Sequence, residues 1–292
     1  MPRIGAHMSV AGGLPLAIAR AQLHQCESLQ IFTKNANQWR ARPLAPEEIA
    51  AFQKAANETG IQPIVSHASY LINIATANPA LRAQSLAALG EEVDRAEALG
   101  LLGVVLHPGA RMTAPEDDAI AMVVSALAEV IAARAGGKTM ILLEHTAGQG
   151  TAMGASFEQI ASMLDGVRDN KRLGVCLDTC HLLASGYDIC SEDGYRETFD
   201  RFDELIGFER LEVFHLNDSK KPCRSRVDRH EHIGKGCVGL EPFRRLVNDP
   251  RFDRLPMVIE TEKTGTREKM KIVPDPLDVM NLDILRSLRK QG

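Results

Sequence analysis

Leu173-Gly-Val-Cys-Leu177, followed at once by Asp178-Thr-Cys-His181, is the most informative junction in the chain. The first part is a short apolar run of strand length. It ends abruptly at Asp178 and His181, two side chains that bind metal ions well, and a loop containing Gly186 follows. We interpret the junction as a buried strand that delivers chemistry at its carboxyl end.

Seven further apolar runs have the same character. They are Arg3–Met8, Ser28–Phe32, Pro63–Ser66, Leu102–Leu106, Met140–Leu143, Leu211–Leu216 and Pro256–Ile259. Because they do not alternate with polar residues, they indicate strands buried on both faces, as in a parallel sheet covered by helices. Helical periodicity lies between the runs, with start signals at Pro46, Asn78-Pro79, Pro115 and Ser156. Eight strands alternating with eight helices predict a closed (β/α)8 barrel or an open doubly wound sheet.

The composition is typical of a globular protein with a large core, since 45% of the 292 residues are hydrophobic and 25% are charged. No linker, charge block or repeat divides the chain. We therefore expect one domain over residues 1–292, with the tail 263–292 supplying a closing helix around Leu277–Leu288. The longest loops, 67–79, 145–155, 182–195 and 217–239, all follow strands.

The same survey limits the location and the partners. No apolar run approaches the roughly 18 residues that cross a bilayer, and no secretory leader begins the chain. We expect a cytoplasmic protein, nucleoid-associated in a bacterium, with no membrane partner. A net charge of −4 argues against general coating of polyanions but leaves local contact with nucleic acid open. The six cysteines form no Cys-x-x-Cys pair, which indicates free thiols.

Imidazoles and carboxylates gather at the strand ends and in the loops that follow. A single histidine there is commonly structural, but so many together would be costly without cations or an ion-pair network, and few basic residues lie nearby. The nitrogen and oxygen donors suit zinc, with manganese or iron as alternatives. One ion uses about four donors, so nine suggest a cluster of two or three. The nine are His67, His107, Glu144, Asp178, His181, His215, Asp228, His230 and Glu260.

Several separated motifs follow one another along the chain. They are His107-Pro-Gly109, Glu144-His-Thr-Ala-Gly-Gln-Gly150, Gly174-Val-Cys-Leu-Asp178-Thr-Cys-His181, Gly186-Tyr-Asp188, His215-Leu-Asn-Asp218, Ser225-Arg-Val-Asp228-Arg-His230 and Glu260-Thr261. In order and spacing, from Ile4 to Thr261, the chain resembles the endonuclease IV family of apurinic/apyrimidinic (AP) endonucleases.

The resemblance implies a single (β/α)8 TIM barrel of the xylose isomerase type that holds three zinc ions. It also implies which residues bind each ion. The first ion would be bound by His67, His107 and Glu144. The second would be bound by Glu144, Asp178, His215 and Glu260, and the third by His181, Asp228 and His230. Asp178 and His181 would then serve different ions.

Such a cluster suits phosphodiester hydrolysis, because close metal ions make hydroxide available near neutral pH and neutralise charge on the phosphate. Glu144 and Glu260 are the candidate catalytic carboxylates. Glu260 is the better candidate to orient the attacking water or to accept its proton.

Two loops resemble the parts of the family that contact DNA. Tyr70 matches a tyrosine that enters the duplex at the lesion, and an aromatic wedge can hold a stack open. Asn37 stands where the family often carries an arginine that fills the gap left by the flipped nucleotide, so we expect a less well filled gap. Lys34, Lys220 and Arg229 are candidate phosphate contacts.

The leading hypothesis is therefore a monomeric hydrolase that cuts double-stranded DNA 5′ to an abasic site, leaves a 3′-hydroxyl, and trims 3′-phosphate or phosphoglycolate ends. One rival is a one-metal sugar isomerase or epimerase, which leaves His67, His107 and His181 without an ion to bind. The other is a DNA-damage binding module whose metal ions are structural.

Overall fold

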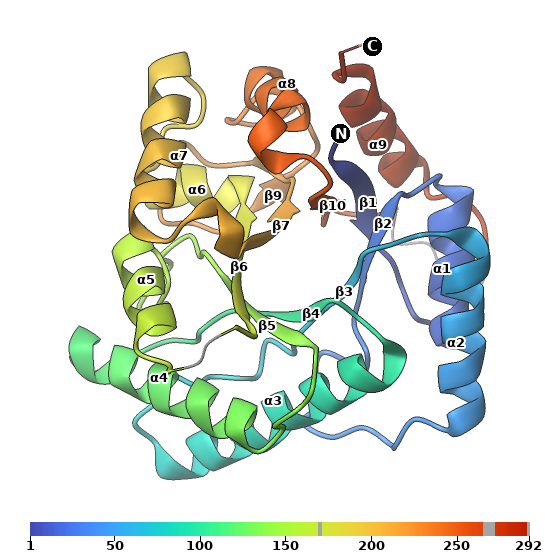
Figure 1. Ribbon diagram of the computed structural model, residues 1–292. Coiled ribbons are helices and arrows are strands. Elements are labelled where there is room, and N and C mark those ends of the chain that lie inside the picture. Colours follow the sequence, from blue (N-terminus) through green and yellow to red (C-terminus); the bar gives the residue numbers. More distant parts are fainter. Residues whose placement is uncertain (169–170, 265–271, 291–292) are drawn as a thin grey trace.

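The computed structural model describes residues 1–168, 171–264 and 272–290. Eight parallel strands close into a barrel in the order β1-β10-β7-β6-β5-β4-β3-β2, so the open-sheet alternative is wrong and the (β/α)8 barrel is confirmed (Figure 1). The strands are β1 (Arg3–His7), β2 (Ser28–Ile31), β3 (Ile64–His67), β4 (Gly103–Leu106), β5 (Met140–Glu144), β6 (Leu173–Asp178), β7 (Leu211–His215) and β10 (Pro256–Ile259).

The described ranges contain nine α-helices, where the sequence predicted eight. They are α1 (Leu14–Leu23), α2 (Pro46–Thr59), α3 (Pro79–Leu99), α4 (Glu116–Ala132), α5 (Phe157–Asp165), α6 (Thr179–Ser185), α7 (Glu192–Leu205), α8 (Leu240–Asn248) and α9 (Pro276–Ser287). Two short 3-10 helices, η1 (Phe208–Arg210) and η2 (Pro250–Phe252), precede β7 and β10. The additional helix is α6, which begins directly after β6.

Two predicted loops therefore contain regular structure. Residues 182–185 belong to α6, and α7 begins at Glu192, so only residues 186–191 of the predicted loop 182–195 remain irregular. The loop 217–239 carries a small antiparallel sheet of β8 (Asp218–Ser219) and β9 (His230–Glu231). The predicted closing helix is α9, whereas residues 265–271 and 291–292 of the tail lie outside the described ranges. That residues 1–292 form one domain stays a prediction.

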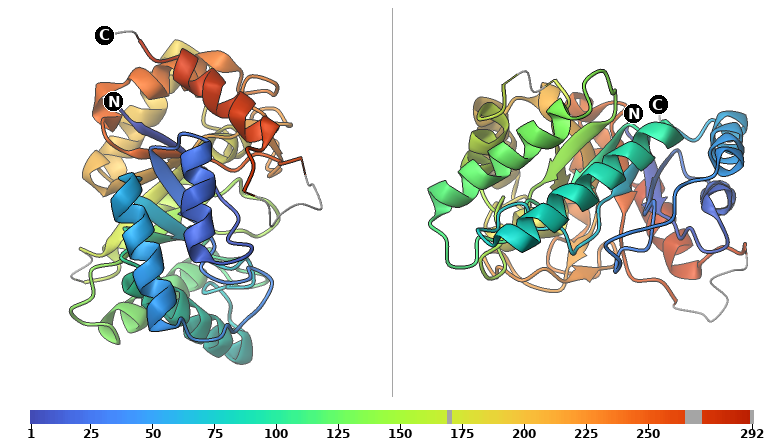
Figure 2. Two further views of the ribbon diagram at one scale, coloured as in Figure 1. Left: turned by 90° about the vertical axis from the view of Figure 1, so that its right-hand side faces the viewer. Right: turned by 90° about the horizontal axis from the view of Figure 1, so that it is seen from below.

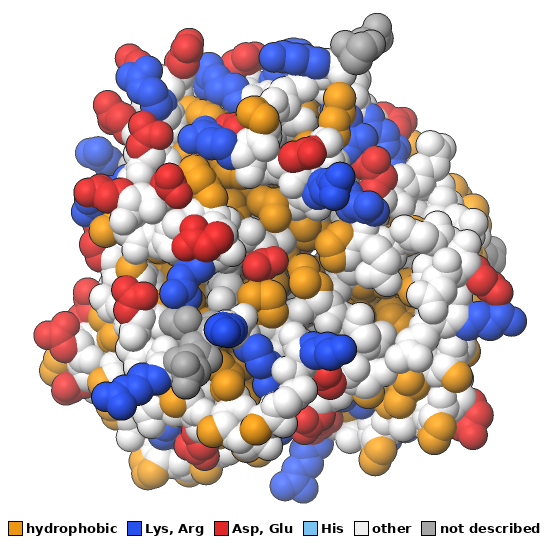
Figure 3. Space-filling model, in the orientation of Figure 1, with side chains coloured by type: hydrophobic (Ala, Val, Ile, Leu, Met, Phe, Trp, Pro, Cys, Tyr) orange, Lys and Arg blue, Asp and Glu red, His pale blue; other side chains and the backbone are white. Residues whose placement is uncertain are grey.

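The helices other than α6 surround the barrel in chain order, with α1 beside α2, α3 beside α4 and α5 beside α7 (Figure 2). α9 packs against β1, where the barrel closes. On the face shown in Figure 3, Lys and Arg side chains are interspersed with Asp and Glu, as expected from a net charge of −4. None of the helices in the described ranges combines the length and apolarity that crossing a membrane requires.

A buried layer inside the barrel supports the functional end of the strands. Five side chains form it, one from each of five strands: Val65, Val105, Leu142, Cys176 and Val213. Successive side chains of a strand point to opposite faces, so the residue two positions further along points into the barrel again. The strands therefore present their next inward side chains one level above this layer, at the carboxyl end.

Candidate metal centre

The level above the apolar layer consists of imidazole and carboxylate side chains, the predicted metal ligands. Each of these side chains lies two residues after a member of the layer in the sequence. They are His67 above Val65, His107 above Val105, Glu144 above Leu142, Asp178 above Cys176 and His215 above Val213. Glu260 follows β10 directly. Barrel enzymes build their active sites at this end of the strands.

The first group of donors lies around one oxygen of Glu144. His67 Nε2 lies 3.1 Å and His107 Nε2 lies 3.0 Å from Glu144 Oε2. The three donors lie within 4.8 Å of one another, as required for ligands of one ion. This is the first ligand set that the family resemblance implies.

The second group lies around His215. Its Nδ1 lies 3.1 Å from Glu144 Oε1, 3.1 Å from Glu260 Oε2 and 3.9 Å from Asp178 Oδ2. The carboxylate of Glu144 thus directs one oxygen to each group, which is the arrangement of a bridging ligand. The second implied ligand set is also brought together.

The third group differs in one respect from the expectation. His181 Nε2 lies 3.2 Å from Asp228 Oδ2, and His230 Nε2 lies 3.3 Å from Asp228 Oδ1, as expected. However, His230 Nε2 also lies 3.6 Å from Asp178 Oδ2, and Asp178, His181 and His230 form a group of their own. Asp178 therefore adjoins both the second and the third positions.

A cysteine also adjoins the third position, although the sequence interpretation left cysteines out. Cys180 joins Asp228 and His230 in a further group of donors. Burial raises the pKa of the Cys180 thiol to about 12, so its sulfur is unionised at neutral pH and is a poor ligand in that form. Nitrogen and oxygen remain the prevailing donors at all three positions.

Hydrogen bonds to the backbone determine which ring nitrogen of His67 and of His181 is presented to the other donors. His67 Nδ1 donates to the carbonyl of Ala68, and His181 Nδ1 donates to the carbonyl of His145. Because a carbonyl only accepts, these bonds fix the proton on Nδ1 and leave Nε2 free to bind a metal. His181 Nε2 and His230 Nε2 are buried and make no well-aligned hydrogen bond, although Asp228 oxygens lie 3.2 and 3.3 Å away; a bound cation would satisfy both nitrogens.

The spacing and electrostatics also fit metal ions. Zinc with bonds of about 2.0 Å in tetrahedral geometry separates its ligand atoms by about 3.3 Å, and the donor separations described above range from 3.0 to 3.9 Å. Burial disfavours ionisation of Glu144, yet the charges of His107 and His215 hold its pKa well below the usual value. Burial likewise opposes charging of His181, but Asp178 and Asp228 raise its pKa well above the usual value. The cluster therefore favours added positive charge.

Two amide side chains that the sequence analysis missed orient the donors. Gln30 on β2 accepts from His215 Nε2 at 2.8 Å and donates to Glu260 Oε1 at 2.5 Å, so it directs His215 Nδ1 toward the carboxylates. Asn217 donates to Asp178 Oδ2 at 2.6 Å and accepts from the backbone nitrogen of Glu260 at 2.8 Å. The sequence indicates Gln30 only through its position in β2, where its side chain points into the barrel. Asn217 lies within the motif His215-Leu-Asn-Asp218 that the sequence analysis had already identified.

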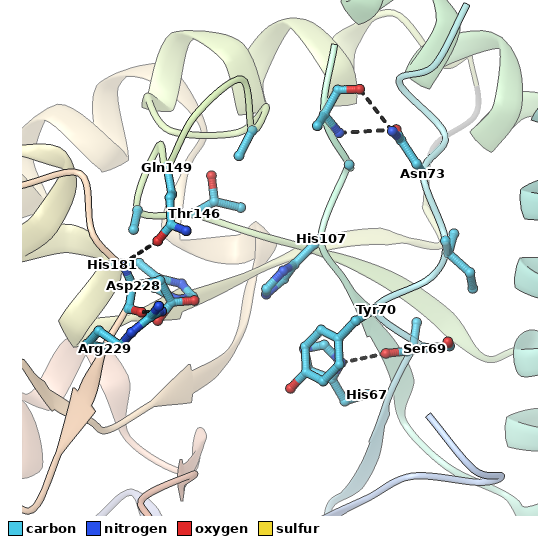
Figure 4. A pocket seen from close by; sticks show the side chains of 16 residues that line it. His67, Ser69, Tyr70, Asn73, His107, Thr146, Gln149, His181, Asp228 and Arg229 are labelled. Carbon is cyan, nitrogen blue, oxygen red and sulfur yellow. Dashed lines mark hydrogen bonds and ion pairs between the residues drawn. The ribbon is translucent and has the colours of Figure 1, made fainter. Parts of the chain in front are cut away.

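A pocket of about 310 Å³ opens beside the first and third groups. Figure 4 shows His107 between the side carrying His181 and Asp228 and the side carrying Tyr70. Tyr70 is 60% exposed, and the centre of its ring lies 5.1 Å from that of His67. Arg229 lines the pocket opposite Tyr70, beside Asp228. These two residues therefore face the same space as the metal-binding side chains.

The other predicted DNA contacts lie elsewhere. Asn37 is exposed in the loop after β2, and Lys220 is exposed but lies 3.8 Å from Glu262. Lys34 is buried, with only 1% of its side chain exposed, and lies 3.5 Å from the buried carboxylate of Glu92. The structure thus places Lys34 where a phosphate does not reach it, because Glu92 and two backbone carbonyls enclose its ammonium group.

A (β/α)8 barrel that collects imidazoles and carboxylates at the carboxyl ends of its strands has the architecture of a metal-dependent enzyme. The family described as xylose isomerase-like TIM barrel matches residues 18–281. A protein of Chloroflexus aurantiacus named probable endonuclease 4 is 49% identical over 288 residues, covering 99% of this chain and 98% of its own length. The solved structure of endonuclease IV from Thermus thermophilus matches with a TM-score of 0.83 and 36% identity, covering 98% of each chain. The chain therefore belongs to the endonuclease IV family.

The fold is shared more widely. The solved structure of a D-tagatose 3-epimerase-like protein matches with a TM-score of 0.71 at 18% identity, covering 98% of this chain and 96% of its own. At this identity the similarity extends to the fold alone.

Proposed function

We propose that this protein is a metal-dependent DNA-repair endonuclease that hydrolyses the phosphodiester 5′ to an abasic site and leaves a 3′-hydroxyl. The observation that carries the proposal is the convergence of nine imidazole and carboxylate donors into adjoining groups that share Glu144, Asp178 and His230, in a chain that belongs to the endonuclease IV family. We include removal of 3′-phosphate and phosphoglycolate ends, because those groups offer the same centre a phosphate ester.

The three groups would hold three zinc ions, with Glu144 and Asp178 each between two positions. Bound zinc supplies Lewis-acid chemistry: it lowers the pKa of water and neutralises charge on a phosphate. Manganese or iron could replace zinc at individual positions, since nitrogen and oxygen donors accept all three.

The chain's own residues would orient the substrate and move the proton. Glu260 accepts a hydrogen bond from Gln30 and lines a small pocket together with Tyr70, so its carboxylate would orient a water beside the scissile phosphate. Tyr70 would enter the duplex beside the lesion, and Arg229 would bind a phosphate across the pocket. The protein would act as a monomer on double-stranded DNA.

An end-labelled duplex with one abasic site tests the proposal directly. We expect one cut 5′ to the site, a product that a DNA polymerase extends without further treatment, and about three ions per chain by metal analysis. Duplexes ending in 3′-phosphate or 3′-phosphoglycolate should become extendable after incubation. One ion or none per chain, together with no incision of the abasic duplex, would contradict the proposal.

A further inference from the structure

The buried carboxylate of Glu92 gathers donors from two separate loops. Glu92 lies on α3 with 1% of its side chain exposed, and its Oε2 accepts from the Thr33 hydroxyl at 2.8 Å. Its Oε1 lies 3.5 Å from Lys34 Nζ and accepts from the backbone nitrogen of Ser69 at 3.3 Å. Thr33 and Lys34 belong to the loop after β2, and Ser69 belongs to the loop after β3.

The ammonium group of Lys34 extends this connection toward the surface. Lys34 Nζ donates to the carbonyls of Gln38 at 2.9 Å and Trp39 at 3.3 Å. It therefore fixes the backbone immediately after Asn37, although the side chains of Asn37 and Gln38 are exposed. A buried ammonium group needs such a set of acceptors, because its desolvation is otherwise costly.

The two loops also contact each other directly. The Ser69 hydroxyl donates to the carbonyl of Ala36 at 2.5 Å, one residue before Asn37. The rings of Phe32 and Tyr70 lie edge to face at 5.9 Å. Ser69 directly precedes Tyr70, so the contacts from Glu92 lead to the exposed aromatic ring as well as to the Asn37 segment.

We propose that the buried pair of Lys34 and Glu92 is a positioning device that sets the distance between Tyr70 and the Asn37–Trp39 segment and thereby determines selectivity for abasic duplex. The proposal rests on the proposed function for the identity of the substrate. The two residues touch neither the metal-binding groups nor the substrate, and they act through the loops that they hold. This role replaces the phosphate contact expected of Lys34.

Replacing only Lys34 or only Glu92 would leave the other residue as an unpaired buried charge, which destabilises the fold. The test variant therefore replaces both residues with uncharged ones. In Lys34→Met with Glu92→Gln neither member of the pair is left as a lone buried charge, while the hydrogen bonds to Gln38 and Trp39 are lost. Asp94→Asn is the matched control. Asp94 also lies on α3, but its ion pair with Arg134, which follows α4, does not reach the two loops.

Three measurements on the metal-loaded enzyme distinguish positioning from general support. We expect the double variant to raise KM for the abasic duplex about tenfold with a much smaller change in kcat, since misplacement by about 1 Å at a binding group has effects of this order or larger. Hydrolysis of bis(p-nitrophenyl) phosphate, which needs the metal centre but not the loops, and the metal content should stay within about twofold of wild type. Amide exchange should accelerate in residues 36–39 and 70–72.

Wild-type KM and wild-type exchange in the double variant would overturn the proposal. A parallel loss of small-substrate hydrolysis and metal content would also overturn it, because the pair would then support the whole barrel. If the wild-type protein cut no abasic duplex while exchange still accelerated in the variant, the proposed function would fail, the pair would keep its role of holding the loops, and its assignment to abasic selectivity would be overturned.

Discussion

Asp178→Asn should remove more metal than the loss of any ligand that serves a single position. Asp178 adjoins two candidate positions, one with Glu144 and His215 and one with His181 and His230, whereas His107 adjoins only one. If the protein holds three ions, we expect His107→Ala to retain about two per chain and Asp178→Asn to retain about one.

Asparagine is the informative replacement because Asp178 is also the N-cap of α6. Its Oδ1 accepts from the backbone nitrogen of His181 at 3.0 Å, and asparagine caps helices about as well as aspartate. The hydrogen bond from Asn217 to Asp178 Oδ2 would be lost, at a cost of about 1 kcal/mol in the free energy of unfolding. Loss of an orienting contact alone lowers metal affinity about 10- to 100-fold, and loss of a ligand should exceed that.

The assay is elemental analysis per chain after dialysis against a zinc buffer that keeps the wild-type protein fully loaded. The melting temperature of the metal-free variants, measured in parallel, separates ligand loss from unfolding. If Asp178→Asn retained as many ions as His107→Ala, Asp178 would serve one position, and the shared role assigned to it would be wrong.

Four other residues of the site can be tested in the same way. Glu260→Gln should abolish incision while DNA binding measured by gel shift is largely kept, with Glu158→Gln on the outer helix α5 as the control; undiminished turnover would remove Glu260 from the reaction. Tyr70→Ala should lower the preference for abasic over intact duplex about 5- to 150-fold, since stacking a base on an aromatic ring is worth about 1–3 kcal/mol, and an unchanged preference would assign Tyr70 to packing. Gln30→Ala should weaken zinc binding about 10- to 100-fold in a competition titration, and wild-type affinity would show that Gln30 does not orient His215. The raised pKa of His181 means that protons compete with zinc, so affinity should rise with pH and calorimetry should detect proton release; affinity independent of pH between about 5 and 8 would contradict this.

The barrel was predictable because its strands carry a local signal. An apolar run that does not alternate, such as Leu173–Leu177, is distinctive of a strand buried on both faces, and the observed strand β6 extends one residue further, to Asp178. The missed helix α6 also had a signal, since the Asp178 carboxylate caps the backbone nitrogen three residues later. We interpreted Asp178 only as a ligand, although one of its oxygens caps the helix and the other faces the donors.

The convergence of the predicted metal ligands could also be predicted from local sequence, because it follows from the alternation of side chains along each strand. The contacts of Lys34 and Asp178 with residues distant in sequence could not. His67, Glu144 and His215 each follow the inward phase of a strand, so the pattern of two places them together. The burial of Lys34 depends on Glu92, which is distant in sequence and lies on a different element, so its own neighbours gave no indication of it. The position of Asp178 between two groups depends likewise on where the loop carrying His230 folds back.

The most direct test of the central claim is incision of a single-abasic duplex during stepwise return of zinc to metal-free protein. The account predicts that the metal-free protein is inactive and that full incision returns only as the third equivalent binds, with the cut 5′ to the lesion and a 3′-hydroxyl product. Full activity after one equivalent, or turnover of a ketose in place of incision, would contradict it and favour the one-metal sugar isomerase or epimerase.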